Sequence, residues 1–288
     1  MAQRPPPPAL SDAPLAGGLY LVATPIGNLR DITLRALDVL AAADLVLAED
    51  TRVTGKLLSV YGLSARLERY DEHAAARARP KVLAMLAEGA RVALASDAGT
   101  PLISDPGYRL VREAIEQGAD VFAVPGASAV LAGLSIAGLP TDRFLFAGFP
   151  PPKSAARRTF LAGLKATPAT LVFFEGASRL GASLKDMAEV LGPRPAAVTR
   201  ELTKLHETAV RGNLATLAAD PAQQHPKGEV VVVVGLGETV AAEPADAAAA
   251  LAEALTRLSP ADAAREVAGA LGLPRRELYR QALAMQGR

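Results

Sequence analysis

Residues Arg91 to Arg109, with the sequence RVALASDAGTPLISDPGYR, combine features that suit ligand binding. An apolar run, Val92–Ala95, ends at Ser96, and a loop containing glycine and proline leads to a helix expected to begin at Tyr108. Such loops present backbone N–H donors, and glycine lacks the Cβ that would keep a ligand away from the backbone. In open α/β sheets, ligands bind at loops that follow the carboxyl ends of strands. The stretch predicts a ligand-binding loop, although taken alone it also fits an ordinary strand–loop–helix connection.

The elements that must position this loop repeat a strand–loop–helix pattern through the first half of the chain. The predicted strands are Leu19–Ala23, Leu45–Ala48, Val92–Ala95 and Val121–Val124, and the predicted helices are Thr33–Ala43, Val53–Tyr61, Pro80–Glu88 and Tyr108–Gln117. Every strand ends in a polar or glycine- and proline-containing loop, which predicts a parallel sheet whose carboxyl edge gathers ligand loops. In the second half we expect strands at Phe144–Phe149, Thr170–Phe174, Ala196–Thr199 and Val230–Val234, with a helix at Leu180–Leu191.

The composition indicates a globular protein with more than one domain. The chain has 288 residues, of which 50% are hydrophobic and 21% charged, and its net charge is +1. This length allows two cores, and the charge balance requires any nucleic-acid surface to be a local patch. Since there is no cysteine and only three histidines, disulfides and cysteine chemistry are excluded and no metal site is expected. We predict a cytoplasmic protein without a membrane segment, because Pro125-Gly126 interrupts the uncharged stretch Val121–Leu139.

Two basic regions are candidates for contact with nucleic acid. Lys153, Arg157 and Arg158 follow a run of prolines, and either phosphate binding or a solvated helix face explains them. In the C-terminal segment, a helix from Ser259-Pro260, a turn at Leu271–Pro274 and a helix over Arg275–Met285 have the outline of a helix-turn-helix. The arginines of that segment either contact RNA or belong to a helical hairpin that merely packs; the residues concerned include Arg275, Arg276 and Arg280.

Five segments, taken in order, closely resemble one family. They are TPIGNLRDITLRAL (Thr24–Leu37), AEDTR (Ala48–Arg52), SDAGTPLISDPG (Ser96–Gly107), VPGASA (Val124–Ala129) and TRELTKLHE (Thr199–Glu207). Together they resemble the small-subunit ribosomal RNA methyltransferases of the tetrapyrrole-methylase-like class, which use S-adenosylmethionine (SAM). The resemblance spans residues 17–237. It implies 2′-O-methylation of a cytidine ribose in 16S rRNA, at the decoding region of the small ribosomal subunit.

The resemblance also implies a domain plan and a cofactor site. We expect a disordered proline-rich arm (1–16), an N-terminal α/β SAM-binding domain (17–127), a second α/β domain that completes the SAM cleft (128–240), a helical RNA-contact module (244–288), and a homodimer. Expected SAM-binding residues are Asp97, Ala98, Gly99, Thr100, Pro101, Leu102, Ile103, Pro125, Gly126 and Ser128, with Phe174, Val233 and Gly235 covering the adenine. Expected RNA contacts are Arg52, Lys153, Arg157, Arg158, Arg275, Arg276 and Arg280.

A ribose hydroxyl is a poor nucleophile while neutral, so a base or a cation should assist it. We expect Arg200, Glu201 and Lys204 to orient or deprotonate the ribose, helped by Asn28 and Asp50. For each of these residues a structural ion pair or helix cap is the alternative. Many relatives carry histidine where Ser178 stands, so this chain has no catalytic histidine there. The competing interpretations are a tetrapyrrole C-methyltransferase and a non-catalytic RNA-binding assembly factor.

Overall fold

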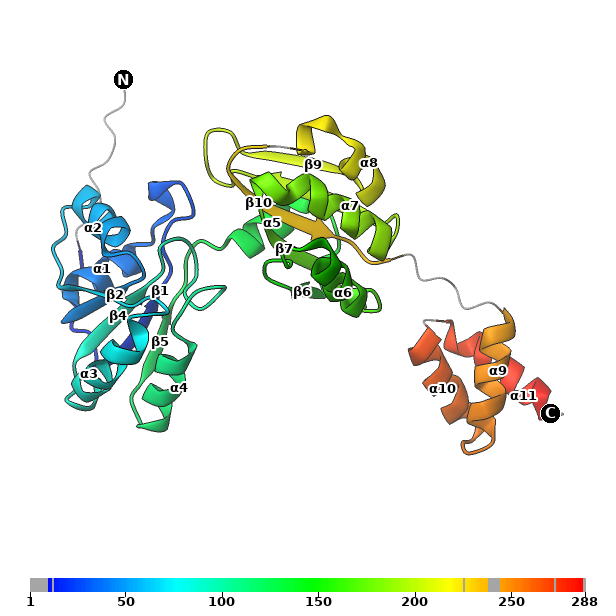
Figure 1. Cartoon of the computed structure of the whole chain (residues 1–288). Helices are drawn as coiled ribbons and strands as arrows, with labels where there is room; N and C mark the ends of the chain where they lie inside the picture. The colour runs from blue at the N-terminus through cyan, green and yellow to red at the C-terminus, as the bar shows by residue number, and fades with distance from the viewer. Residues whose placement is uncertain (1–9, 12, 225, 238–243, 272, 287–288) are drawn as a thin grey trace, which may run out of the picture. The chain divides into compact units, whose positions relative to one another are not determined.

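The computed structural model describes residues 10–11, 13–224, 226–237, 244–271 and 273–286. The chain divides into two compact units, Met1–Gly235 and Leu236–Arg288 (Figure 1). The first unit contains two five-stranded sheets, and the second contains helices. Most of the predicted proline-rich arm (residues 1–9 and 12), part of the connection after the second sheet (238–243) and the last two residues lie outside the described residues.

The first sheet is parallel throughout, as the sequence pattern predicts. Its order is β3-β2-β4-β1-β5. The strands are β1 (Gly18–Val22), β2 (Leu45–Ala48), β3 (Leu67–Arg69), β4 (Arg91–Ala95) and β5 (Val121–Val124), and the helices are α1 (Leu34–Ala42), α2 (Thr51–Val60), α3 (Ala75–Ala87) and α4 (Tyr108–Glu116). Because the strands run parallel, the loops that follow them emerge at one edge of the sheet.

Two details of this sheet differ from the expectation. Helix α3 begins at Ala75, so that Pro80 lies inside it rather than at its start. Asp71 explains the earlier start, since its carboxylate accepts a hydrogen bond from the Ala74 N–H (2.7 Å) ahead of the first turn. Strand β3 was not predicted, because its three residues are too few to show a periodic pattern.

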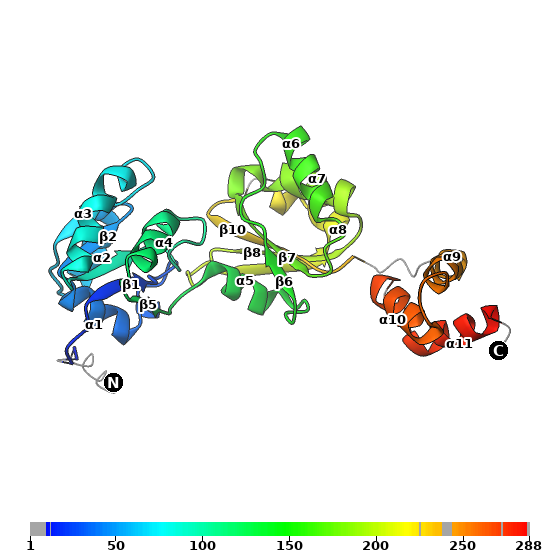
Figure 2. The ribbon, with the colours of Figure 1, turned by 90° about the horizontal axis from the view of Figure 1, so that it is seen from below.

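The second sheet is mixed, with order β6-β7-β10-β8-β9. Its strands are β6 (Phe144–Phe146), β7 (Thr170–Gly176), β8 (Pro195–Arg200), β9 (Thr208–Asn213) and β10 (Glu229–Val234), and β10 runs antiparallel to both neighbours. Helix α5 (Ala129–Ala137) covers one face, and α6 (Ser154–Leu164), α7 (Leu180–Leu191) and α8 (Leu214–Ala219) cover the other (Figure 2). A Cβ on Gly133 would lie 2.9 Å from Val231 Cγ1, so this glycine allows α5 to approach the sheet closely. Strand β9 and helix α8 were not predicted.

The second unit consists of α9 (Pro244–Leu255), α10 (Pro260–Leu271) and α11 (Arg275–Met285) in the described residues after 243. Helices α10 and α11 confirm the predicted hairpin, whereas the bounds of α9 were not predicted. Leu251, Val267 and Leu278 are buried, so each helix contributes to one small core. In the described part of the chain, no helix has the length and apolar character required to cross a membrane.

Candidate functional site

The loops after β1, β4 and β5 are joined by hydrogen bonds at the carboxyl edge of the first sheet. Thr24 and Gly99 exchange two backbone hydrogen bonds, each 3.0 Å long. The Thr24 hydroxyl donates to the Ser96 carbonyl (2.9 Å), and the Thr100 hydroxyl donates to the Ala127 carbonyl (3.3 Å). These loops therefore form one continuous surface rather than three separate turns.

The loop after β2 joins the same edge. The Asp50 N–H donates to Asp97 Oδ1 (3.0 Å), which ties the AEDTR segment to the glycine-containing loop. Asp50 is also the N-cap of α2, and hydrogen bonds from Arg52 lower the pKa of its carboxyl to about 2. A carboxylate held in this way is a weak base, so the structure gives Asp50 a capping role beside the loops.

Backbone strain is concentrated in two loops. Among the described residues, the non-glycine positions with positive φ are Leu102 (72°), Ser104 (67°), Glu201 (52°) and Thr203 (67°). The first two lie in the loop after β4, and the other two lie in the loop after β8. Such conformations persist where the surrounding structure enforces them, and they cluster at ligand-binding and active sites.

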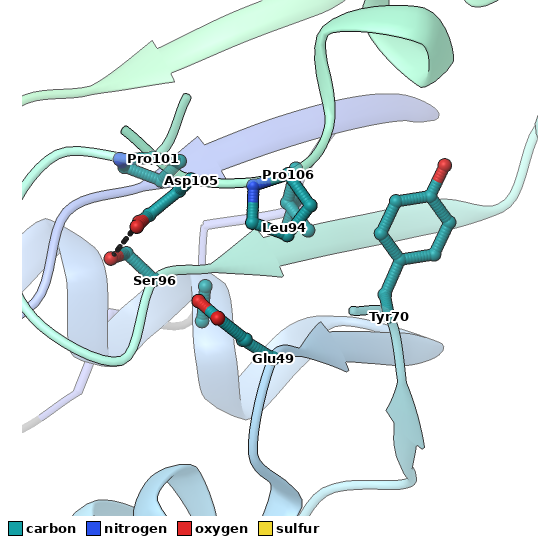
Figure 3. Close-up of a pocket in the computed structure, with 8 residues that line it drawn as sticks. Glu49, Tyr70, Leu94, Ser96, Pro101, Asp105 and Pro106 are labelled. Atoms are coloured by element: carbon teal, nitrogen blue, oxygen red, sulfur yellow. Dashed lines mark hydrogen bonds between the residues drawn. The ribbon is translucent and has the colours of Figure 1, made fainter. Parts of the chain in front are cut away.

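A partly buried pair of acidic side chains lies beside the loop after β4 (Figure 3). Glu49 and Asp105 line a small pocket together with Ser96 and Tyr70, and the Ser96 hydroxyl donates to the Asp105 carboxylate. Burial raises the pKa of Glu49, and the nearby carboxylates of Asp105 and Asp97 raise it further. Burial also raises the pKa of Asp105, against the effect of the Ser96 hydrogen bond. A cationic ligand bound here would reduce the electrostatic repulsion among these carboxylates.

Replacing Glu49 with glutamine should stabilise the free protein at neutral pH. A carboxyl whose folded-state pKa exceeds its unfolded value destabilises the fold as pH rises above the unfolded pKa, here about 4.5. Urea unfolding should therefore show a more stable variant at pH 7 and little difference at pH 4. Affinity for cationic SAM should fall about tenfold, the effect of ~1.4 kcal/mol. Glu88→Gln, at an exposed position, is the control and should change neither quantity; an unchanged pH 7 stability for Glu49→Gln would contradict the argument.

The loop after β8 holds a lysine between two carboxylates. Lys204 Nζ lies 3.0 Å from Glu201 Oε1 and 2.9 Å from Glu229 Oε2. Glu201 Oε1 also accepts a hydrogen bond from the Glu229 N–H (3.0 Å). The hydrogen bond from Lys204 lowers the pKa of Glu201. Desolvation lowers the pKa of Lys204, but its hydrogen bonds to Glu229 and Glu201 outweigh this effect and raise it. At neutral pH the lysine is a cation and Glu201 an anion.

The loop after β1 contacts this lysine-containing loop. The Asn28 N–H donates to the Thr203 hydroxyl (3.1 Å), and a Cβ on Gly27 would lie 2.6 Å from Lys204 Cγ. The structure thus brings together three of the predicted catalytic residues, Asn28, Glu201 and Lys204. Arg200 is the last residue of β8 and donates to the Lys227 carbonyl (3.1 Å), and Asp50 lies beside Asp97.

Of the three residues expected to cover the adenine, Phe174 and Val233 belong to one apolar cluster, on the adjacent strands β7 and β10. Val233 is fully buried among side chains of α5 and the second sheet, so its side chain has no exposed surface to offer a ligand. Because β10 runs antiparallel to β7, Val231 pairs with Phe174, and Gly235 lies beyond the opposite end of the pairing. Phe174 instead packs against Phe146 and Phe149, with ring centroids 4.7 and 5.4 Å away.

Part of the expected RNA surface has a structural role instead. Arg157 lies on α6 and is 3% exposed, with Nε 2.8 Å from Asp186 Oδ2, so it cannot serve as a phosphate contact. Arg158 pairs with Asp186 and Glu189, and Arg52 pairs with Asp50. The exposed cations among the predicted set are Arg52, whose side chain is 88% exposed, Lys153 and, on α11, Arg275, Arg276 and Arg280, the last at 3.4 Å from Glu277.

Sequence reasoning missed several residues of the site. Asp105 was not among the expected site residues, although its position between serine and proline in the SDAGTPLISDPG segment is a signal that could have found it. Phe149 is 54% exposed beside Phe174. It was not considered because the three prolines that follow it were interpreted only as the approach to Lys153, Arg157 and Arg158. Thr54, which is buried beneath the loops, carries no distinguishing sequence signal.

Comparisons with known proteins agree with this geometry. Residues 18–218 match the tetrapyrrole (corrin/porphyrin) methylases, and residues 241–286 match the RsmI C-terminal HTH domain. A ribosomal RNA small subunit methyltransferase I from Mesorhizobium japonicum is 54% identical over 275 residues, covering 95% of this chain and 94% of the relative. A protein of the same name from Escherichia coli O157:H7 is 46% identical over 276 residues, covering 94% and 96%.

Solved structures share the fold. A uroporphyrin-III-C-methyltransferase from Thermus thermophilus has a TM-score of 0.54 at 25% identity and covers 76% of this chain and 94% of its own. Diphthine synthase has a TM-score of 0.58 at 15% identity, covering 75% and 89%, which shows the fold alone.

Proposed function

The chain belongs to the tetrapyrrole methylase family of SAM-dependent methyltransferases, and from this premise we propose that it methylates ribosomal RNA of the small subunit. The relatives named as ribosomal RNA small subunit methyltransferase I support an rRNA substrate. More finely, we propose that it transfers a methyl group to the 2′-oxygen of a cytidine ribose in 16S rRNA, at the decoding region. The observation that carries the proposal is the convergence of the loops after β1, β2, β4 and β5 at one sheet edge.

The residues at this edge suit SAM. Its sulfonium and ammonium groups are cations, and the carboxylates of Glu49 and Asp105 lie close together at the loop after β4. Its carboxylate requires N–H donors, which the segments Asp97–Ile103 and Pro125–Ser128 can supply. A Cβ on Gly126 would lie 3.0 Å from Ala23 Cβ, so glycine keeps these neighbouring loops close together. Phe174 and its neighbour Phe149 offer aromatic surface for the adenine.

The bound SAM supplies an activated methyl group, and the chain's residues must orient and activate the ribose hydroxyl. Lys204, a cation at neutral pH, can stabilise negative charge that develops on the attacking oxygen. Glu201 keeps the ammonium in place and, with its lowered pKa, acts as a positioning residue rather than as the base. Asn28 connects this loop to the SAM-binding edge through the hydrogen bond to Thr203. Alignment of the reacting atoms supplies most of the rate in such a displacement.

Outside the reaction centre, exposed cations are the side chains suited to contact RNA. The exposed arginines at the start of α11, together with Lys153, suit backbone phosphates, whose contacts with Lys and Arg dominate RNA affinity. We propose that residues 244–288 bind RNA in this way, that the protein works as a homodimer, and that it meets its substrate in the cytoplasm.

A methylation assay tests the proposed function. Tritiated SAM should label 30S subunits that lack the modification and should label neither mature 30S subunits nor uroporphyrinogen. Alkaline hydrolysis should leave the labelled nucleotide joined to its neighbour, because a 2′-O-methyl group removes the hydroxyl that attacks the phosphodiester. Labelling of uroporphyrinogen would favour a tetrapyrrole methyltransferase, and SAM binding without any transfer would favour an assembly factor.

A further inference from the structure

A groove lies between α2 and the loop after β1, beside the proposed SAM-binding edge. We call it the α2 groove; its lining includes Leu29, Val53, Leu57, Val60, Ser96 and Asp97. Its volume is about 360 Å³, within the range of small-molecule sites. The groove shares Ser96 and Asp97 with the loop after β4, so whatever occupies it lies next to those loop residues.

The walls of the groove are apolar and accessible. Leu29, Val53 and Val60 are 44%, 45% and 53% exposed, although each would be expected to avoid water. Exposed apolar side chains that gather around a hollow mark a binding surface more often than isolated ones do. Flat apolar ligands, such as a nucleobase, suit walls of this kind.

The inner end of the groove is polar. Asp97 Oδ1 accepts the Asp50 N–H at 3.0 Å, and within the described residues no side chain or backbone donor bonds to Oδ2. A carboxylate oxygen in this situation can accept from an exocyclic amino group, as carboxylates do with cytosine N4. Thr54 also lines the groove, is 1% exposed, and has a buried hydroxyl with no hydrogen-bond partner. An unsatisfied buried hydroxyl costs stability, so a binding role would explain its presence.

The groove leads toward the lysine-containing loop. Leu29, at its rim, follows Asn28, whose N–H donates to Thr203, the residue before Lys204. Lys56 is exposed on the α2 side of the rim, where it suits a backbone phosphate. Three features thus follow one another along the surface. Lys56 comes first, then the α2 groove with Asp97 at its inner end, and then the loop after β8 that is proposed to act on the ribose.

We propose that the α2 groove binds the base of the nucleotide that is methylated, unpaired and turned out of the RNA, with Asp97 accepting from its amino group. Proteins recognise RNA sequence largely through unpaired bases whose edges are free for hydrogen bonding. The inference rests on the proposed function and adds to it the part of the chain that selects the nucleotide.

The test is Val53→Asp, which places a charge on the apolar wall at an exposed position. With undermethylated 30S subunits, kcat/KM should fall at least about 30-fold, while the Kd for SAM by calorimetry stays within about twofold. Ile115→Asp is the matched control, because Ile115 is 59% exposed on α4, and it should leave both quantities unchanged.

A second variant addresses the buried hydroxyl. Thr54→Val should raise the melting temperature, because it removes an unpartnered buried oxygen, and lower kcat/KM about tenfold. Reconstituted subunits with uridine at the methylated position should also react at least about tenfold more slowly than those with cytidine, since uridine lacks the amino group.

The outcomes separate the two proposals. Normal methylation by Val53→Asp, or equal rates for cytidine and uridine, would overturn the base site and leave the proposed function standing. Loss of SAM binding in Val53→Asp would assign the groove to the donor instead and also overturn the base site. Wild-type protein that methylates no 30S subunit would overturn both.

Discussion

Replacing Glu201 with alanine is expected to lower the rate of methyl transfer at least about 100-fold, while SAM affinity changes by no more than about threefold. The carboxylate holds Lys204 Nζ at 3.0 Å and accepts the Glu229 N–H at 3.0 Å. Without it, Lys204 keeps only Glu229, whose side chain is 75% exposed, so the ammonium is drawn toward solvent. The measurement is the single-turnover rate of tritium transfer to undermethylated 30S subunits, with calorimetry for SAM.

Two further variants show how Glu201 acts. Glu229→Ala removes the other carboxylate from Lys204 but leaves Glu201, and we expect less than a tenfold loss. Glu201→Gln keeps an acceptor for the Glu229 N–H and removes the charge, so it should preserve the melting temperature and still lose most of the rate. Because the pKa of Glu201 is lowered, the wild-type rate should show no inflection at the ordinary glutamate pKa. An inflection there that disappears in Glu201→Gln would make the residue the base, and near-normal turnover by Glu201→Ala would refute its role.

Most of the first sheet could be predicted because its central strands, β1, β2 and β4, are largely buried on both faces. Leu45–Ala48 and Val92–Ala95 are uninterrupted apolar runs, and each is followed by polar or glycine-containing residues that end the strand. Burial on both faces is typical of parallel strands with helices on each side. Parallel order then places every ligand loop at one edge, so the convergence of these loops followed from local pattern alone.

The second sheet could not be predicted in the same way. The run Val230–Val234 reads as a buried strand in either direction, because an apolar segment carries no information about the orientation of its neighbours. Its antiparallel pairing with β7 and β8 depends on contacts between distant parts of the chain. The position of Val233 and Gly235 relative to Phe174 therefore could not be derived from the sequence.

The candidate site could likewise be predicted only in part. The residue types of the TRELTKLHE segment pointed to Glu201 and Lys204, and both lie in one hydrogen-bonded cluster. The positive φ of Glu201 and Thr203 has no signal in the residue types, since neither residue favours that conformation. Arg157 was expected to contact RNA because a cation after a run of prolines suggests an exposed side chain. The sequence does not show that Asp186, on another helix, pairs with it.

Replacing Asp186 with alanine is expected to lower the free energy of unfolding by about 3–5 kcal/mol, because it leaves buried cationic charge without its partner. Asp186 is 4% exposed and accepts from the Ser154 hydroxyl (2.9 Å) and from Nε of Arg157 (2.8 Å) and Arg158 (3.0 Å). Desolvation raises its pKa, but the hydrogen bonds from Arg158, Ser154 and Arg157 outweigh this and lower it, so the carboxylate is ionised at neutral pH.

Urea unfolding of the full chain measures this loss, and Glu189→Ala is the matched control. Glu189 also pairs with Arg158, but its side chain is 52% exposed, so its removal should cost less than about 1 kcal/mol. Asp186 is on α7 and pairs with α6, on the face of the second sheet opposite α5, so Asp186→Ala protein that remains folded should keep its affinity for SAM. A loss below about 1 kcal/mol would mean that solvent reaches Arg157 and replaces its partner, and the arginine would then return as a candidate for contact with RNA.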